Sequence, residues 1–238
     1  MKPNSKYIIF TDFDGTISNG DVCDNFFSEY SDYTKVNELY NEMLNHKIKA
    51  TDFWNKSFEL LVNINPNNLN DFVSKQSIDG SFVKFNSFCK ENNIPLIILS
   101  DGMSFYIKQI LEKYKISLPY YSNNCEIINN RLIPNFPFTD SDCTSCANCK
   151  RNHMLTKSSD DQIIILIGNG KSDMCPAHYA DIVFAKDDLL KYCESKNITY
   201  YSFQSFSDIE NQMKNIITRK PKHRQTALHA RRDVFISE

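Results

Sequence analysis

The fold is decided by residues 7–16, which read YIIFTDFDGT. The first four residues are apolar and do not alternate with polar ones, a pattern typical of a parallel strand that helices cover on both faces. The run ends abruptly at two carboxylates, Asp12 and Asp14. Because ligands of open parallel sheets lie at the carboxyl ends of the strands, this stretch predicts both the sheet and the place of its site.

Two further apolar runs follow the same design. Residues 95–99 (PLIIL) lead into Ser-Asp-Gly at 100–102, and residues 162–167 (QIIILI) lead into Gly-Asn-Gly at 168–170. The sequence therefore predicts an α/β protein with a doubly wound, mostly parallel, Rossmann-like sheet, whose three strand ends meet at one site. Helices are expected at 82–92, 104–115 and 173–179, and a further short strand at 181–185.

Residues 18–79 have a different pattern. They contain no convincing strand, and their apolar residues recur at spacings of three and four, as they do on amphipathic helices. Polar residues divide the segment into about four helices. We therefore predict a helical cap, inserted after the first strand of a core that is formed by residues 1–17 and 80–218.

The C-terminal segment, residues 219–238, is basic. It carries six Lys and Arg against two Asp and Glu, and it has few large apolar residues. A solvated tail is the first interpretation, and a basic contact for an anionic partner is the alternative.

Length and composition exclude several classes of protein. The chain has 238 residues, 41% of them hydrophobic, which is ample for a buried core and argues against disorder. A net charge of -2 gives no reason to expect a nucleic-acid partner. No apolar segment approaches the roughly 18 residues of a membrane span, so we expect a cytoplasmic protein without a membrane partner.

The two carboxylates of the first motif predict a metal site. Residues two apart in a turn after a strand can project to the same side, so Asp12 and Asp14 are expected to share a cavity. Two carboxylates held so close repel each other unless a cation neutralises them, and Mg²⁺ prefers such oxygen ligands. The alternative is a turn and helix cap made by Asp and Gly. The position of DFDGT directly after a buried strand favours the metal site.

Three motifs carry a resemblance to a known family. Residues 12–16 (DFDGT) resemble motif I of the haloacid dehalogenase (HAD) superfamily, residues 100–102 resemble motif II, and residues 168–173 (GNGKSD) resemble motif IV. A helical insertion between motifs I and II resembles the C1 cap of the phosphoserine-phosphatase-like branch, subclass IB. Cys-Lys at 149–150, SDGMSFYI at 100–107 and ADIVFAKDDLL at 180–190 are most similar to the 2-hydroxy-3-keto-5-methylthiopentenyl-1-phosphate phosphatase family.

The resemblance implies a Mg²⁺-dependent phosphatase that hydrolyses a small phosphorylated metabolite through an aspartyl-phosphate. It assigns Asp12 as the nucleophile and Asp14 as the general acid and base. The Ser100 hydroxyl and the backbone N–H of Gly102 are expected to bind the phosphoryl oxygens.

The superfamily also uses a lysine upstream of motif IV to offset charge at the phosphoryl group. Lys150, Lys157 and Lys171 are in range, and Lys150 is favoured because it begins the helix that leads to the third strand. Asp21 lies nine residues after the first aspartate, where the branch has an acidic residue that contacts the substrate. It could equally be the N-cap of the first cap helix.

Motif IV departs from the family at Asn169, where a metal-binding Asp is usual. An Asn carbonyl can still bind Mg²⁺, but the site loses one negative charge. Asp173 could compensate as a direct or outer ligand, so the expected metal set is Asp12, the backbone carbonyl of Asp14, Asn169 and Asp173. The departure motivates a rival hypothesis, a catalytically weakened phosphometabolite-binding protein. A phosphotransferase or mutase is disfavoured because no feature is seen that excludes water.

A cysteine cluster leaves three interpretations open. Cys143, Cys146 and Cys149 lie within seven residues, and His153 follows shortly after. The three thiols could be reduced and held in a loop, could bind zinc with His153 as the fourth ligand, or could form a redox switch. Reduced thiols are favoured, since structural zinc sites normally show two separated pairs of ligands.

Overall fold

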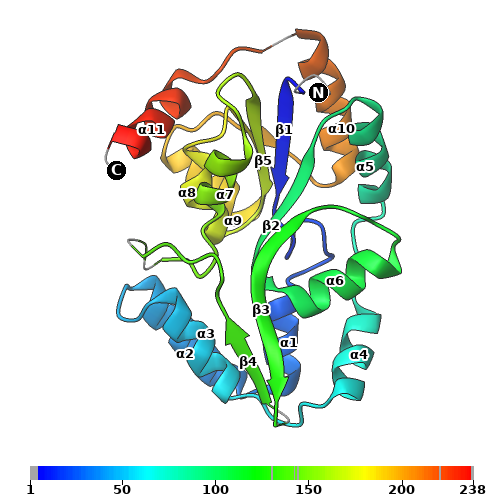
Figure 1. Cartoon of the computed structure of the whole chain (residues 1–238), viewed down its shortest axis with the longest axis vertical. Coiled ribbons are helices and arrows are strands. Elements are labelled where there is room, and N and C mark those ends of the chain that lie inside the picture. Colours follow the sequence, from blue (N-terminus) through cyan, green and yellow to red (C-terminus); the bar gives the residue numbers. More distant parts are fainter. Residues whose placement is uncertain (1–4, 130, 142, 144, 220, 237–238) are drawn as a thin grey trace.

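A single mixed sheet organises the chain. The computed structural model describes residues 5–129, 131–141, 143, 145–219 and 221–236, and within them the sheet has seven strands (Figure 1). The strands lie in the order β4-β3-β2-β1-β5-β6-β7, and every neighbouring pair is parallel except β3 and β4. Their bounds are β1 Tyr7–Thr11, β2 Leu96–Met103, β3 Tyr120–Ile128, β4 Arg131–Asn135, β5 Ile163–Gly168, β6 Ile182–Ala185 and β7 Tyr201–Ser202.

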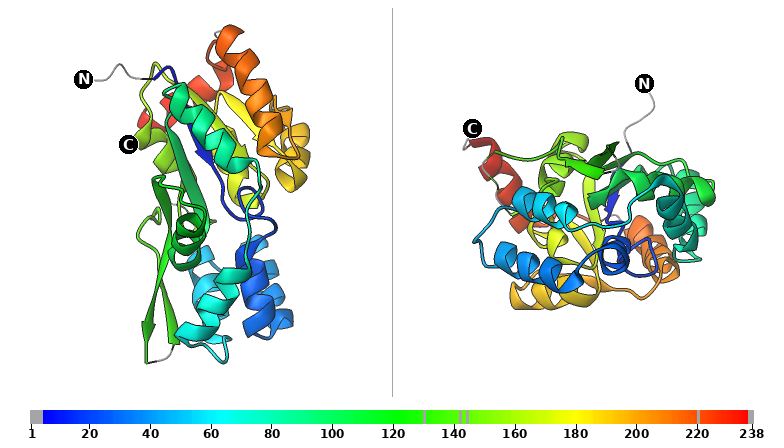
Figure 2. Two further views of the ribbon diagram at one scale, coloured as in Figure 1. Left: turned by 90° about the vertical axis from the view of Figure 1, so that its right-hand side faces the viewer. Right: turned by 90° about the horizontal axis from the view of Figure 1, so that it is seen from below.

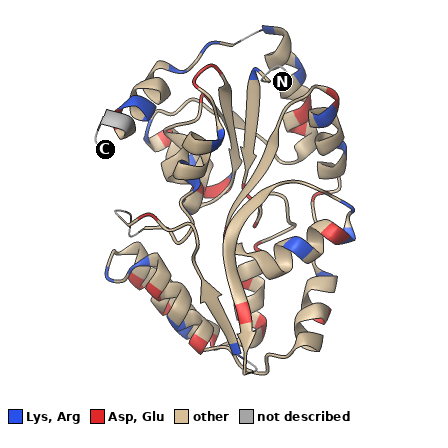
Figure 3. Cartoon of the chain, in the orientation of Figure 1, with Lys and Arg blue, Asp and Glu red and all other residues tan. Residues whose placement is uncertain are grey.

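Helices cover both faces of this sheet, which confirms the doubly wound α/β fold. On β1, Tyr7 and Ile9 join one hydrophobic cluster with α5 and α10, whereas Ile8 and Phe10 join a second cluster with α7, α8 and α9. The strands β1, β5 and β6 carry no charged residue, as their burial on two faces requires (Figure 3). The helices are α1 Val22–Tyr30, α2 Tyr33–Leu44, α3 Ala50–Glu59, α4 Pro66–Lys75, α5 Phe82–Glu91, α6 Ser104–Lys113, α7 Lys150–Lys157, α8 Met174–Ala177, α9 Asp187–Ser195, α10 Phe206–Arg219 and α11 Gln225–Ile236.

The four helices α1 to α4 lie beyond the carboxyl end of β1, at the opposite end of the molecule from the N-terminus (Figure 2). Local sequence sets where two of them begin: the side chains of Asp21 and Asn65 accept backbone N–H groups three residues on, at 2.8 and 3.0 Å. Phe26 lies at the centre of their aromatic packing, with Phe72 at 5.4 Å and Phe105 of α6 at 5.5 Å between ring centroids. The division into a core and a cap of residues 18–79 stays a proposal.

The hairpin of β3 and β4 was not expected. It runs past the end of the parallel sheet, where β4 packs against α3 (Figure 1). Within the described part of the chain, no helix has the length and apolar character needed to span a bilayer.

The C-terminal segment is not a solvated tail, because α11 is tied to the start of β6. The Asp181 side chain is fully buried and accepts N–H groups from both terminal nitrogens of Arg231, at 3.0 and 3.1 Å. Arg224 donates its backbone N–H to the same carboxylate, and its side chain donates to the carbonyl of Ala177 at 2.6 Å. The interpretation of this segment as a solvated tail is therefore wrong for residues 221–236. Residues 220, 237 and 238 of the segment lie outside the described residues.

Replacing Arg231 with Met is expected to lower the free energy of unfolding by about 2–4 kcal/mol, because the buried Asp181 carboxylate then loses its bidentate partner. The measurement is chemical denaturation, with Arg232→Met at the neighbouring exposed position as the control. Equal midpoints for the two variants would show that the Asp181 contact does not hold α11.

Candidate active site

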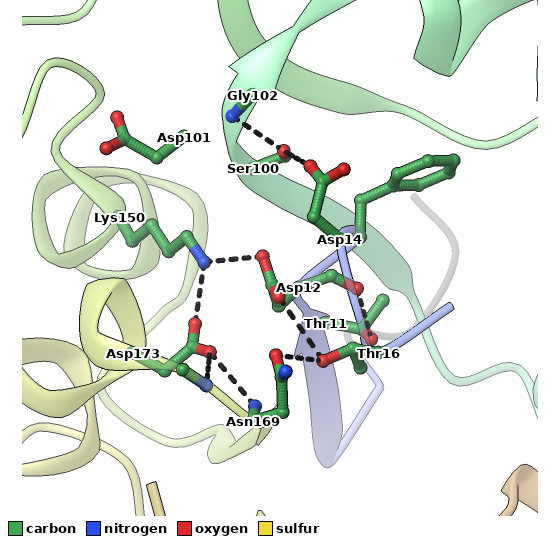
Figure 4. A network of polar contacts seen from close by, with 12 residues as sticks. Thr11, Asp12, Asp14, Thr16, Ser100, Asp101, Gly102, Lys150, Asn169 and Asp173 are labelled. Atoms are coloured by element: carbon green, nitrogen blue, oxygen red, sulfur yellow. Dashed lines mark hydrogen bonds and ion pairs between the residues drawn. The ribbon is translucent and has the colours of Figure 1, made fainter. Parts of the chain in front are cut away.

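The carboxyl ends of β1, β2 and β5 meet at one place, and the side chains that follow them face one another (Figure 4). A fourth side chain comes from Lys150, the first residue of α7. The site residues that the structure brings together are Asp12, Asp14, Ser100, Gly102, Lys150, Asn169 and Asp173.

Lys150 links the first and third strand ends. Its ammonium lies 2.7 Å from Asp12 Oδ1 and 2.6 Å from Asp173 Oδ1, and the residue is only 3% exposed. The ammonium groups of the two rival lysines lie elsewhere. Lys157 Nζ is 5.2 Å from the centre of the Tyr121 ring, and Lys171 Nζ is 5.0 Å from the centre of the Tyr40 ring in α2. Lys150 is therefore the one of the three that contacts a motif I carboxylate.

Burial and charge oppose each other in this trio. Burial raises the pKa of Asp12 to about 7, and the charge of Asp173 adds to the rise while the Lys150 ammonium opposes it. Burial lowers the pKa of Lys150, but the charges of Asp12 and Asp173 outweigh it and raise that pKa above its ordinary value. The lysine is therefore a permanent cation between two carboxylates. A divalent cation beside Asp12 would favour the ionised carboxylate further.

Asp14 turns away from Lys150 and toward β2 (Figure 4). Its Oδ2 accepts hydrogen bonds from Ser100 Oγ at 3.0 Å and from Tyr106 Oη at 2.8 Å, and its Oδ1 accepts the backbone N–H of Val22 at 3.2 Å. Burial raises the pKa of Asp14 well above its ordinary value, and the charges of Asp21 and Asp12 add to the rise. The hydrogen bonds from Tyr106 and Ser100 lower this pKa in turn, but burial is the larger effect, and a raised pKa is the direction that a proton donor requires.

Gly102 must be a glycine because other atoms already occupy the space of a side chain. A Cβ at this position would overlap the hydroxyl of Tyr106 and lie 2.5 Å from Asp14 Oδ2. Its backbone N–H donates to Ser100 Oγ at 2.9 Å. The fully buried Ser100 hydroxyl thus lies between a backbone donor and a carboxylate acceptor.

Oxygen atoms suited to a hard cation gather beside Asp12. The Thr16 hydroxyl lies 2.9 Å from Asn169 Oδ1 and 3.2 Å from Asp12 Oδ2, so these two oxygens are neighbours. A carboxylate oxygen and an amide oxygen are ligands of the kind that Mg²⁺ accepts, and the backbone carbonyl of Asp14 stays a predicted third ligand. Among the described residues, no group of three or more His, Cys, Asp or Glu is arranged to hold a metal.

Both carboxylate oxygens of Asp173 have partners within the site. Its Oδ1 binds Lys150, and its Oδ2 accepts the backbone N–H groups of Asn169 and Gly170 at 3.1 and 3.2 Å. Both oxygens of the fully buried carboxylate therefore hold other groups in place. These contacts let Asp173 position Lys150, and its role as a direct or outer metal ligand stays a prediction.

Asp21 is the N-cap of α1, as one of the two interpretations had it. Its Oδ1 accepts the backbone N–H of Asp24 at 2.8 Å, and the next residue, Val22, donates its own N–H to Asp14. Helix α1 is thereby connected directly to motif I. A substrate contact by Asp21 stays a proposal.

His153 Nε2 and the clustered cysteines Cys143 and Cys146 have different contact partners. Cys143 Sγ and Cys146 Sγ are 3.5 Å apart, and all eight cysteines are free thiols. His153 Nε2 instead lies 2.8 Å from Asn148 Oδ1, and its ring stacks on Tyr121 at 4.4 Å. His153 is therefore not a fourth ligand of a zinc site.

Three polar residues of the site were missed from the sequence: Thr16, Tyr106 and Asn148. Each lies inside or beside a motif, but none has a residue type that signals catalysis by itself. Tyr106 offered one usable signal, since it lies in the first turn of the helix after motif II, on the face that must be buried.

Comparison with known proteins agrees with this geometry. A protein of Bacillus cereus (strain ATCC 10987 / NRS 248) named 2-hydroxy-3-keto-5-methylthiopentenyl-1-phosphate phosphatase is 29% identical over 216 residues, which cover 88% of this chain and 96% of that protein. The structure titled "Phospho-Aspartyl Intermediate Analogue of Phosphoserine phosphatase" superposes with a TM-score of 0.68 at 15% identity, over 88% of this chain and 99% of that one. A HAD family hydrolase of Salmonella enterica serovar Typhi superposes with a TM-score of 0.67 at 16% identity, over 85% of this chain and 69% of that one.

These likenesses confirm the HAD-type fold and the resemblance drawn from the three motifs. The family described as Putative Phosphatase (Put_Phosphatase) matches residues 7–200, which include all of the site residues brought together by the strand ends. The chain belongs to the Putative Phosphatase family, and its fold is that of a HAD phosphatase.

Proposed function

We propose that the protein hydrolyses a small-molecule phosphomonoester in a Mg²⁺-dependent reaction through an aspartyl-phosphate on Asp12. The observation that carries this proposal is the buried trio of Asp12, Lys150 and Asp173 at the carboxyl ends of β1 and β5. An ammonium fixed 2.7 Å from a carboxylate oxygen can offset the negative charge that gathers there when the carboxylate and a phosphoryl group approach each other.

In the first step a carboxylate oxygen of Asp12 attacks phosphorus in line with the bond to the leaving oxygen. A bond forms between the Asp12 oxygen and phosphorus, and the bond between phosphorus and the substrate oxygen breaks. Asp14 gives its proton to the departing alkoxide. In the second step Asp14 takes a proton from water, and the water oxygen forms a bond to phosphorus. The bond between phosphorus and the Asp12 oxygen breaks, which gives inorganic phosphate and restores the Asp12 carboxylate.

Three groups of the chain hold the phosphoryl oxygens in this scheme. Lys150 supplies a positive charge from one side, and the Ser100 hydroxyl and the Gly102 N–H supply hydrogen bonds from the other. In the structure the Gly102 N–H donates to Ser100 Oγ and the Ser100 hydroxyl donates to Asp14 Oδ2, so in this scheme both donors exchange these partners for the phosphoryl oxygens when substrate binds. Mg²⁺, when bound by Asp12, Asn169 and the Asp14 carbonyl, supplies the positive charge that offsets repulsion between the carboxylate and the phosphate.

The substrate proposal rests on the Bacillus relatives. They are named for 2-hydroxy-3-keto-5-methylthiopentenyl-1-phosphate, and we propose this compound or a related phosphorylated metabolite, met in the cytoplasm, as the substrate. Asp21 is the N-cap of α1, and the next residue donates its backbone N–H to Asp14, which supports the proposal that Asp21 contacts the leaving group. A catalytically weakened binding protein is not favoured, because Asp12 contacts Lys150, Asp14 contacts Ser100, and the relatives are named as phosphatases.

The test is a screen of phosphorylated metabolites that measures released inorganic phosphate with Mg²⁺ and with a chelator in its place. We expect turnover of a few small phosphomonoesters with Mg²⁺ and none with the chelator. Tight binding of those metabolites without phosphate release would instead support the binding protein.

Asn169→Asp is expected to lower the Mg²⁺ concentration that gives half-maximal activity by about tenfold, because it adds a negative charge to the oxygen set. A tenfold change corresponds to about 1.4 kcal/mol, well below the roughly 4 kcal/mol between two unit charges 4 Å apart at an effective dielectric of 20. The measurement is a Mg²⁺ titration of activity, with Asn197→Asp at an exposed position as the control. Equal half-saturation would mean that Asn169 is not a ligand.

A further inference from the structure

Asn148 connects two parts of the site that are far apart in the sequence. It lies two residues before Lys150 and is only 1% exposed. Its backbone N–H donates to Asp101 Oδ1 at 2.9 Å. Its side-chain Nδ2 donates to the carbonyls of Ser100 at 2.7 Å and Tyr121 at 2.9 Å. One buried residue thus binds the turn that carries the Ser100 hydroxyl and leads directly into the helix that carries the lysine.

These partners fix the orientation of the Asn148 amide. Carbonyl oxygens only accept hydrogen bonds, so the group that faces Ser100 and Tyr121 must be the NH₂. The remaining Oδ1 can only accept, and its neighbour at 2.8 Å is His153 Nε2. The histidine must therefore carry its proton on Nε2 and donate it.

The surroundings of His153 hold its ring in one orientation and favour its neutral form. Its ring stacks on Tyr121 at 4.4 Å and meets the edge of Phe138 at 4.8 Å, so it cannot turn without losing both contacts. Burial lowers the pKa of His153 to about 4, so the ring is neutral near pH 7. With both amide hydrogens, the amide oxygen and the backbone N–H in use, Asn148 is fully satisfied.

We propose that Asn148, held by His153, is a positioning residue that sets the distance between the Ser100 hydroxyl and the Lys150 ammonium across the phosphoryl group. This inference rests on the proposed function, because both groups act there on the phosphoryl oxygens. A shift of about 1 Å in such groups can cost about 100-fold in rate. The Mg²⁺ ligands lie on the other side, after β1 and β5, and do not contact Asn148.

The decisive variant is Asn148→Asp, which keeps the volume of the side chain but sets carboxylate oxygens against two carbonyls. We expect kcat to fall about tenfold or more and the Kd of inorganic phosphate, measured by calorimetry with Mg²⁺ present, to rise about fivefold or more. The Mg²⁺ half-saturation should change less than twofold. Asn86→Asp is the matched control, because Asn86 is a 4% exposed asparagine in α5, away from the site.

A merely structural role would give a different result: both variants would melt earlier, while kcat and the phosphate Kd of Asn148→Asp stayed within twofold of the wild type. That outcome would overturn the proposal. If Asn148→Asp does not fold, His153→Phe decides instead, since it keeps an aromatic ring against Tyr121 but removes the donor. It should weaken phosphate binding in the same direction, and an unchanged phosphate Kd would overturn the proposal equally.

The two proposals can fail separately in this design. Absence of phosphate release by the wild-type protein would refute the proposed function. The comparison of phosphate Kd values needs no turnover, so it still tests whether Asn148 positions the two phosphate-binding groups.

Discussion

Asp12→Asn is expected to lower turnover by about 10⁴-fold or more, because an amide cannot form the acyl-phosphate and single removals of nucleophiles reach this size. The fold should survive, since Lys150 keeps Asp173 as its charged partner at 2.6 Å. The measurements are kcat at saturating Mg²⁺ and the circular dichroism spectrum. Asp71→Asn, at an exposed position of α4, is the control and should retain wild-type turnover.

Near-native turnover by Asp12→Asn would remove the basis of the covalent mechanism. Loss of turnover together with loss of the folded spectrum would show that the ion pair of Lys150 and Asp173 is not enough to keep the protein folded when position 12 is neutral.

Lys150→Met is expected to lower kcat by about 10²–10³-fold, as removal of a single group that stabilises transition-state charge does. It should also destabilise the protein, because Asp12 and Asp173 then remain as buried carboxylates without their shared cation. Added Mg²⁺ should recover part of the stability, since the proposed metal site lies beside Asp12. The measurements are kcat and the unfolding midpoint with and without Mg²⁺.

Lys157→Met is the matched control for this prediction. Lys157 lies on the same helix, but its ammonium lies over the ring of Tyr121 and not between Asp12 and Asp173. A kcat for Lys150→Met within about twofold of this control would exclude Lys150 from the phosphoryl site.

The sheet could be predicted where burial on two faces leaves a continuous apolar run. Residues 7–10, 95–99 and 162–167 correspond to β1, β2 and β5, and the polar residues after them do meet at one site. The strands β3 and β4 gave no such signal. Their sequences YYSNNCEII and RLIPN mix polar and apolar residues, and Pro134 is unusual inside a strand.

The C-terminal helix was missed for a related reason. Its attachment comes from Arg224 and Arg231 binding one buried carboxylate, Asp181, rather than from an apolar face. A count of basic residues gives the charge of the segment but not its partner, because Asp181 lies more than 40 residues away in the sequence.

Pairing within the site has the same limit. The motifs predicted which residues gather, but not that Asp173 would accept a hydrogen bond from Lys150, or that Asp14 would accept one from Tyr106. Such pairings depend on side-chain direction at the ends of different strands. A sequence read one segment at a time does not contain that information.

The central claim is the covalent intermediate on Asp12, and chemical trapping tests it most directly. Protein turning over a phosphomonoester with Mg²⁺ is mixed rapidly with borohydride, which reduces an acyl-phosphate to the alcohol, and the peptide that contains residues 7–16 is analysed by mass spectrometry. The account predicts homoserine at position 12 only when substrate is present. Reduction at another residue, or a phosphoryl group found on a side chain other than Asp12 during turnover, would contradict it.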